Sequence, residues 1–264
     1  MQFDDQADIY DKRTGLGEKT AQSIAASLDQ MIQPHLAGQF LEIGAGTGEI
    51  GFFLQNLPIP YVGIDLSAGM LDVYRKRFDQ HQNMPHLIQT DGNEQWPFEQ
   101  GTVSVFFSSR AMHQLNQQNV LKQLERLSSP SGSILILGNV KRNKKSVKTI
   151  MRKQMHQVLN EFGLKEKSGQ SNRNQLFEII EQQGGERLEP VTTSRWKVSH
   201  APIDSINSWQ NVDGIAGQSV DQALKTQILE TLIVRAKEQF NDLNQALEAE
   251  ETYELNAIKL PYNQ

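Results

Sequence analysis

Cysteine is absent from the 264 residues of this sequence. Disulfide bonds, thiolate zinc sites and a cysteine nucleophile are therefore excluded. Long apolar runs are absent too, since none approaches the ~18–20 residues that a bilayer span requires. The first residues also lack the positive and apolar regions of a secretory signal peptide. We therefore expect a cytoplasmic protein with no membrane partner, and we predict no metal site.

Basic residues are fewer than acidic ones. The sequence has 26 Lys and Arg residues and 31 Asp and Glu residues, which gives a formal net charge of −5. A field of this sign repels phosphate backbones, so the composition argues against nucleic acid as a general partner. The basic run from Lys141 to Lys148 is the exception. We interpret this run as a solvated loop and helix face, with binding of an acidic partner as the alternative.

Short apolar runs alternate with helical patterns over the first half of the chain. Continuous apolar runs predict strands at residues 40–43, 61–65, 86–90, 103–107 and 133–138. Helical spacing of apolar residues predicts helices at residues 17–36, 50–57, 67–78 and 117–127. Strands of this kind, separated by helices, favour a parallel sheet that is covered by helices on both faces.

The second half of the chain departs from this rhythm. Its pattern predicts a helix that follows the mainly basic residues 141–145 and extends to about residue 162, further helices at about residues 175–183, 203–209 and 220–240, and strands at residues 187–198 and 253–260. We therefore expect a core of residues 1–140, a helical insertion or cap of residues 141–185, and residues 186–264, which complete the sheet and the cap. Together these segments are predicted to form one domain.

A glycine-rich turn, Gly44-Ala45-Gly46-Thr47-Gly48, follows the predicted strand 40–43. Glycine is needed where the backbone approaches a ligand closely or adopts a positive φ. Asp65 ends the next strand about 20 residues later, where a carboxylate can accept both hydroxyls of a ribose. The two features together predict a site for an adenosine-containing cofactor.

Two cofactor classes compete for this turn. Read from Gly46, residues 46–51 fit the dinucleotide pattern G-x-G-x-x-G, but Glu49 would then lie at the helix N-terminus where a pyrophosphate binds. Read from Gly44, the strand ends at Ile43 and carries Glu42 near its tip. A cofactor with a positive sulfonium, an ammonium group and no phosphate tolerates these acids. The second register is therefore favoured.

Residues 40–48 resemble the first motif of class I S-adenosylmethionine-dependent methyltransferases, in particular the small-molecule type. Residues 61–71, 91–93 and 96–115 resemble the family's next motifs in the same order, so the resemblance covers about residues 8–140. It implies an α/β, Rossmann-like, seven-stranded mixed sheet with helices on both faces, an antiparallel last strand and helical cap insertions. It also implies S-adenosyl-L-methionine as cofactor and S-adenosyl-L-homocysteine as product.

The resemblance also implies roles for individual residues. Asp65 would hold the ribose hydroxyls, Asp91 the adenine amino group, and Arg13 the carboxylate of the cofactor. The other residues implied at the cofactor are Tyr10, Glu42, Gly44, Ala45, Gly46, Leu66, Met70, Gly92, Asn93 and Ser108.

The loop after the strand 103–107 bears on the chemistry. His113 is the candidate catalytic residue, because a histidine at the carboxyl end of the sheet can act as a general base near neutral pH. A packed or solvent-facing loop histidine is the alternative. Methyl transfer to a nucleophilic acceptor needs no base, since positioning supplies much of the rate. The Asn-Pro-Pro-Tyr/Phe type of amino-methylating motif is absent, and Ser108-Ser109-Arg110-Ala111 stands in its place.

We therefore expect a methyltransferase that acts on a small organic acceptor by in-line attack on the sulfonium methyl. A tRNA or protein methyltransferase that uses the basic run is one alternative. A partner protein that binds the cofactor without catalysis is another, and an NAD-linked reductase is a more distant one.

Overall fold

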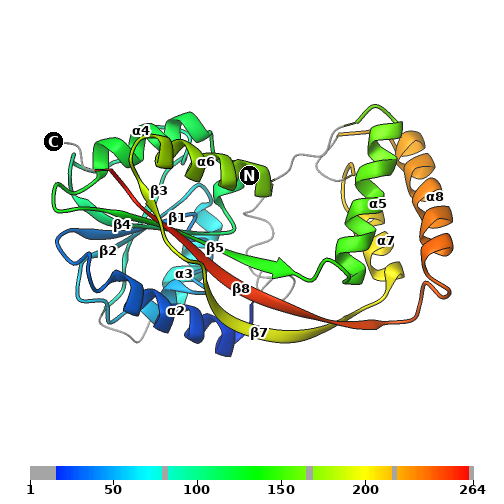
Figure 1. Ribbon diagram of the computed structural model, residues 1–264, viewed down its shortest axis with the longest axis horizontal. Coiled ribbons are helices and arrows are strands. Elements are labelled where there is room, and N and C mark those ends of the chain that lie inside the picture. Colours follow the sequence, from blue (N-terminus) through cyan, green and yellow to red (C-terminus); the bar gives the residue numbers. More distant parts are fainter. Residues whose placement is uncertain (1–15, 79–82, 165–168, 216–218, 262–264) are drawn as a thin grey trace. The chain divides into compact units, whose positions relative to one another are not determined.

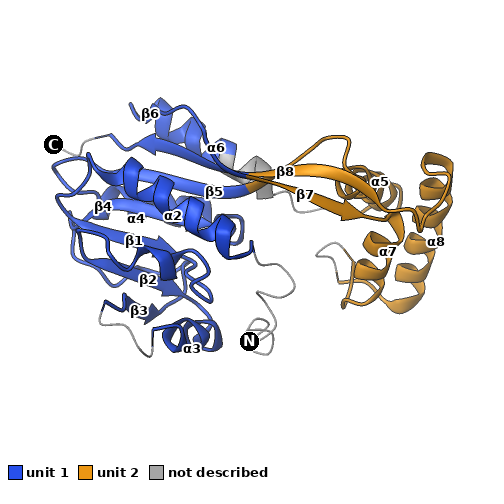
Figure 2. Cartoon of the chain, turned by 90° about the horizontal axis from the view of Figure 1, so that it is seen from below, with its two compact units in different colours: residues 1–139, 169–194, 253–264 blue, residues 140–168, 195–252 orange. Residues whose placement is uncertain are grey.

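The computed structural model describes residues 16–78, 83–164, 169–215 and 219–261. The described residues form two compact units, which Figure 2 colours separately. Unit 1 takes its residues from the ranges 1–139, 169–194 and 253–264, and unit 2 from the ranges 140–168 and 195–252.

An eight-stranded sheet has the order β3-β2-β1-β4-β5-β8-β6, with β7 paired to β8. Its strands are β1 (Gln39–Ile43), β2 (Tyr61–Asp65), β3 (His86–Gln89), β4 (Val103–Ser109), β5 (Ile134–Arg142), β6 (Glu186–Arg187), β7 (Val191–His200) and β8 (Leu247–Lys259). Neighbouring strands from β3 to β5 pair in parallel. The strand order reverses between β1 and β4, and open α/β sheets bind ligands at the carboxyl ends of the strands beside such a reversal.

Helices cover both faces of the sheet in unit 1, as predicted. In Figure 1, α4 (Gln117–Leu127) and α6 (Gly169–Gln182) lie on one face, and α2 (Glu18–Ile32) and α3 (Ala68–Lys76) on the other. Buried apolar side chains of the central strands pack against α4 and α6 in one core cluster, and Leu71 and Tyr74 of α3 belong to a second cluster. The predicted Rossmann-like α/β class is confirmed.

Two elements of the sheet region differ from the sequence prediction. The strand predicted at 187–198 is divided into β6 and β7, because Pro190 has no N–H to donate to a strand ladder. The sheet therefore has eight strands and not seven, and its last strand pairs antiparallel with β6, as expected. The helix predicted at 50–57 is only the 3₁₀ helix η2 (Gly51–Leu54), in a segment that Pro58 soon interrupts.

Unit 2 contains the helices α5 (Val147–Glu161), α7 (Pro202–Gln210) and α8 (Gln222–Gln239). Their apolar faces share a core cluster that includes Met151, Met155, Ile206 and Leu232. Helix α6, which the sequence placed in the cap segment 141–185, belongs instead to unit 1, because its apolar residues lie in the core of the sheet. None of the helices in the described part of the chain has the length and hydropathy needed to cross a membrane.

Candidate functional site

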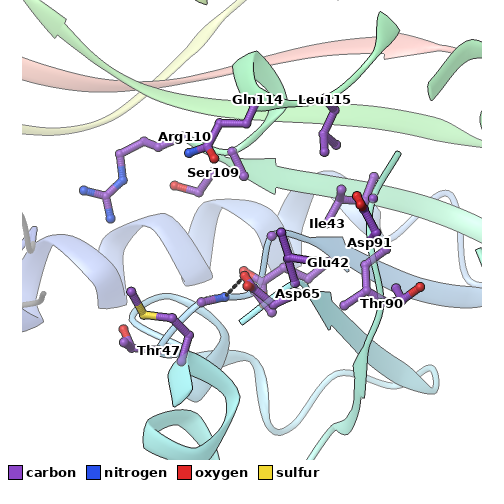
Figure 3. A pocket seen from close by; sticks show the side chains of 18 of the residues that line it. Glu42, Ile43, Thr47, Asp65, Thr90, Asp91, Ser109, Arg110, Gln114 and Leu115 are labelled. Atoms are coloured by element: carbon purple, nitrogen blue, oxygen red, sulfur yellow. Dashed lines mark hydrogen bonds between the residues drawn. The ribbon is translucent and has the colours of Figure 1, made fainter. Parts of the chain in front are cut away.

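A pocket in unit 1 lies at the carboxyl ends of β1, β2 and β4 (Figure 3). It brings together residues that are far apart in the sequence. The predicted cofactor residues that line it are Glu42, Gly44, Ala45, Gly46, Asp65, Leu66, Met70, Asp91, Gly92 and Asn93. Tyr10 and Arg13 lie outside the described residues.

Two glycines of the turn are needed for different reasons. Gly44 has a φ of +73°, and a Cβ built on it would lie 2.2 Å from the Cβ of Ala111. This residue is therefore required for packing between two loops. Gly46 has a φ of +54°, but a Cβ there would meet no protein atom within 4 Å. Because Gly46 lines the pocket, its missing side chain leaves room on the ligand side.

Asp65 is held in place by the backbone. Its Oδ2 accepts a hydrogen bond from the Gly46 amide at 2.8 Å, and its Oδ1 accepts one from the Ser67 amide at 2.9 Å. Each carboxylate oxygen has a second lone pair that can accept another donor. The carboxylate is thus fixed at the end of β2 with capacity for a pair of hydroxyl groups.

Asp91 lies in a turn that several hydrogen bonds define. Its Oδ1 accepts from the Asn93 amide at 2.8 Å. The Gly92 carbonyl accepts from the indole Nε1–H of Trp96 at 3.0 Å and from the side-chain amide of Asn119 at 3.1 Å. Nearby in the pocket lining, Leu66 exposes 42% of its surface although it is apolar. Such an arrangement offers an acceptor edge and an apolar face to a flat, polar-edged ligand.

Glu42 is buried beneath the turn. The hydroxyl of Tyr61 donates to Glu42 Oε2, and the hydroxyls of Tyr61 and Tyr74 lie 2.9 Å apart. Burial raises the pKa of Glu42 to about 8, although the hydrogen bond from Tyr61 opposes the shift and the charge of Asp65 adds to it. Burial likewise raises the pKa of Tyr61 and of Tyr74. Near neutral pH this carboxyl group is therefore largely protonated, and it contributes little negative charge to the pocket.

Glu49 and Arg110 line the pocket as an ion pair that the sequence analysis missed. Arg110 Nη2 lies 2.5 Å from Glu49 Oε2, and the backbone amide of Leu16 donates to Oε1 of the same carboxylate. Arg110 has a φ of +61°, and it is the one residue other than glycine with a positive φ in the described part of the chain. That conformation costs about 1–2 kcal/mol for a residue with a Cβ. Opposite charges in the loops after the adjacent strands β1 and β4 were the signal that could have identified the pair.

Two predicted residues do not line the pocket. Ser108 is buried, and its hydroxyl donates to the Ile43 carbonyl at 2.8 Å, because a buried hydroxyl on a central strand needs a local partner. Its neighbour Ser109 lines the pocket instead and lies 2.6 Å from the hydroxyl of Tyr253. His113 is exposed on the 3₁₀ helix η3 (Met112–Gln114), whereas Ala111, Gln114 and Leu115 on either side of it line the pocket.

The pocket also includes residues to which the sequence analysis assigned no role. Besides Glu49, Ser109, Arg110 and Gln114, they are Ile43, Thr47, Ile50, Ile64, Thr90, Ala111 and Leu115. Within the part of the chain that the structure describes, no three acidic or histidine side chains are grouped so that they could hold a metal ion.

Comparison with known proteins gives one matching family and two curated relatives. Residues 40–132 match the model of a family described as a methyltransferase domain. An uncharacterized methyltransferase of Schizosaccharomyces pombe is 31% identical over 110 residues, which cover 38% of this chain and 38% of the relative. A second one from the same yeast is 24% identical over 140 residues, which cover 52% and 53%. The chain thus spans about half or less of the length of these relatives.

One solved structure extends the likeness to nearly the whole chain. A protein of Bacillus halodurans, provisionally described as a methyltransferase, superposes with a TM-score of 0.57 at 16% identity. The match covers 90% of this chain and 99% of that protein. At this level of identity the similarity concerns the fold.

Proposed function

We propose that this chain is a class I S-adenosylmethionine-dependent methyltransferase and that it transfers a methyl group from this cofactor to a small organic acceptor. The match of residues 40–132 to a methyltransferase-domain family and the fold support the proposal. The cofactor supplies an activated methyl group on a positively charged sulfonium. The role of the protein is to hold that group and an acceptor in line, which can account for a large part of a rate enhancement.

The pocket residues suit this cofactor. The fixed carboxylate of Asp65 can accept both ribose hydroxyls while it keeps its bonds to the Gly46 and Ser67 amides. Asp91 can accept from the adenine amino group, and the exposed side chain of Leu66 can cover an adenine face. Gly46 leaves open space beside the turn. A positive ligand is also compatible with a lining that carries Glu49, Asp65 and Asp91.

The end of β4 and the residues after it favour a small acceptor. Ser109 at the end of β4, and Arg110, Ala111 and Gln114 after it, line the pocket where amino-methylating enzymes carry a different motif. The hydroxyl of Ser109, hydrogen-bonded to Tyr253, offers a polar contact that an acceptor atom could use. No lining residue is required to act as a base, because a nucleophilic acceptor can attack the donor directly when it is correctly placed.

The observation that carries this proposal is the position of the Asp65 carboxylate, which the glycine turn itself holds at 2.8 Å from the Gly46 amide. The test is calorimetric titration of the chain with S-adenosylhomocysteine, with NADH in parallel. We expect the homocysteine derivative to bind, with a loss of affinity of at least about 100-fold in Asp65→Ala, because two charge-assisted hydrogen bonds are removed. Binding of NADH but not of S-adenosylhomocysteine by the folded wild type would refute the proposal.

A tRNA substrate is the main alternative for the acceptor. Lys141, Lys144 and Lys145 are exposed in the structure, as a phosphate-binding patch would require. RNA binding whose affinity falls steeply with salt concentration would support this alternative. Methylation of small nucleophiles by a chain that does not retain RNA at low salt would support the small acceptor.

A further inference from the structure

The charged groups that line the pocket are unequally divided. Besides the largely protonated Glu42, the acids among the described lining residues are Glu49, Asp65 and Asp91, whereas Arg110 is the only Lys or Arg. A ligand that carries a carboxylate therefore has a single cationic side chain to meet among the residues described. The cofactor of the proposed function carries such a carboxylate, next to an ammonium group.

Arg110 lies at the end of the pocket opposite Asp91. In Figure 3 its guanidinium lies on the far side of Asp65 from Thr90 and Asp91, and Asp91 is the residue proposed to meet the adenine. The ion pair with Glu49 is partly buried, with side-chain exposures of 26% for Arg110 and 14% for Glu49. Glu49 also directly follows the glycine turn that ends at Gly48. Both partners thus belong to loops that border the end of the pocket opposite Asp91.

The backbone of Arg110 gives independent support. Its left-handed conformation is held by a hydrogen bond from the Arg110 amide to the Gly138 carbonyl at 3.2 Å. This position carries a residue with a side chain although glycine would adopt the same φ without strain. Strained backbone of this kind clusters at ligand-binding sites, where a side chain must point in a particular direction.

We propose that Glu49 and Arg110 form the recognition site for the amino-acid end of the cofactor. Without ligand the two side chains neutralise each other. With ligand, Arg110 takes the α-carboxylate and Glu49 takes the α-ammonium, so that one ion pair is exchanged for two. A zwitterion compensates both buried charges, whereas a simple anion would leave Glu49 opposing it. This inference rests on the proposed function, and it competes with Arg13 as the partner of the carboxylate.

The test uses two ligands that differ only in this end. S-adenosylhomocysteine carries the amino acid, and 5′-methylthioadenosine has the same thioether and adenosine without it. Calorimetry compares both ligands on the wild type, Arg110→Gln, Glu49→Gln and Arg13→Gln. We expect Arg110→Gln to weaken S-adenosylhomocysteine about 10- to 100-fold, as loss of a hydrogen-bonded charge does. Methylthioadenosine affinity should stay within about twofold, and Asp65→Ala should weaken both ligands.

The outcomes separate the inference from the proposed function. Equal weakening of both ligands by Arg110→Gln would show a structural role and overturn the inference. The inference would also be overturned if Arg110→Gln kept its affinity for S-adenosylhomocysteine while Arg13→Gln lost it. If the wild type binds neither ligand, the proposed function fails and the inference fails with it. Arg110→Gly, which removes the side chain and the strain together, should fold and show the same ligand selectivity as Arg110→Gln.

Discussion

The two ends of the pocket are held together in different ways. At the adenosine end, Asp65 and Asp91 are fixed by backbone amides within a few residues of their own strand ends or in the glycine turn. At the other end, Glu49 and Arg110 pair through their side chains, with one backbone amide, that of Leu16, also bound to Glu49, and beneath the turn Glu42 depends on the hydroxyl of Tyr61. Backbone-held groups keep their positions with or without a ligand, whereas side chains that hold each other can exchange partners.

The strongest test of the backbone-held end is a pair of single-methyl substitutions in the glycine turn. Gly44→Ala should destabilise the fold by about 3–5 kcal/mol, because it combines left-handed strain with a Cβ that would lie only 2.2 Å from the Cβ of Ala111. Gly46→Ala should cost only about 1–2 kcal/mol, since its Cβ meets no protein atom and only strain remains. Urea denaturation of the ligand-free proteins measures both values.

Among variants that fold, Gly46→Ala should lose more affinity for S-adenosylhomocysteine than Gly44→Ala, which is the reverse of their order in stability. Gly46→Ala should weaken S-adenosylhomocysteine at least about tenfold, because the new methyl group takes space beside the ligand. Gly46→Ala with full affinity would mean that the turn is not the ligand cradle. Similar stabilities for the two variants would mean that the turn adapts and is not rigidly held.

The side-chain contact beneath the turn, between Glu42 and Tyr61, is tested by the pH dependence of stability. The folded pKa of Glu42, about 8, exceeds its ordinary value, so between pH 5 and pH 8 the folded chain holds a proton that the unfolded chain has lost. This contribution to stability is complete at acid pH and is lost as the pH rises toward 8. From pH 6 to pH 7 it falls by about 1.4 kcal/mol.

Glu42→Gln should remove this part of the slope, because the amide is neutral at every pH and its oxygen can still accept from Tyr61. Urea denaturation of the ligand-free wild type and variant at pH 6 and pH 7 gives the two slopes. Identical slopes would show that Glu42 is ionised in the folded chain. Asp72→Asn, which changes an exposed carboxyl group on α3, is the matched control and should leave the slope unchanged.

More of the pocket lining was predicted from the sequence at the backbone-held end than elsewhere, for a physical reason. Asp65 and Asp91 follow apolar runs that end in a sheet, and strand ends converge at one edge wherever the strands are parallel. The contact of Arg110 with Glu49 spans 61 positions and depends on a left-handed residue, which no local pattern indicates. The place of Ser109 rather than Ser108 at the pocket depends on which face of β4 each side chain takes.

The same reasoning explains the errors in the fold. The apolar spacing at 50–57 is helical, but three-dimensional constraints limit it to η2, where Gly51 packs under the hydroxyls of Tyr61 and Tyr74. Helix α6 was assigned to the cap by its position in the sequence, although its apolar stripe packs in the core of the sheet. Periodicity shows that a helix has an apolar face, but it does not show which surface that face covers.

The smallest expected effect concerns the adenosine end alone, and it is a preference between two ligands that differ at the adenine amino group. S-inosylhomocysteine carries a carbonyl oxygen where S-adenosylhomocysteine carries the adenine amino group. The wild type should prefer the adenosine ligand about tenfold if Asp91 accepts from that amino group, since the carbonyl would face a carboxylate. In Asp91→Asn one side-chain atom can still accept from the Asn93 amide, so the turn is kept, while the other becomes a donor. The preference should therefore shrink or reverse with little change in stability. An unchanged preference would remove Asp91 from adenine recognition and would leave Asp65 as the principal polar anchor of the adenosine end.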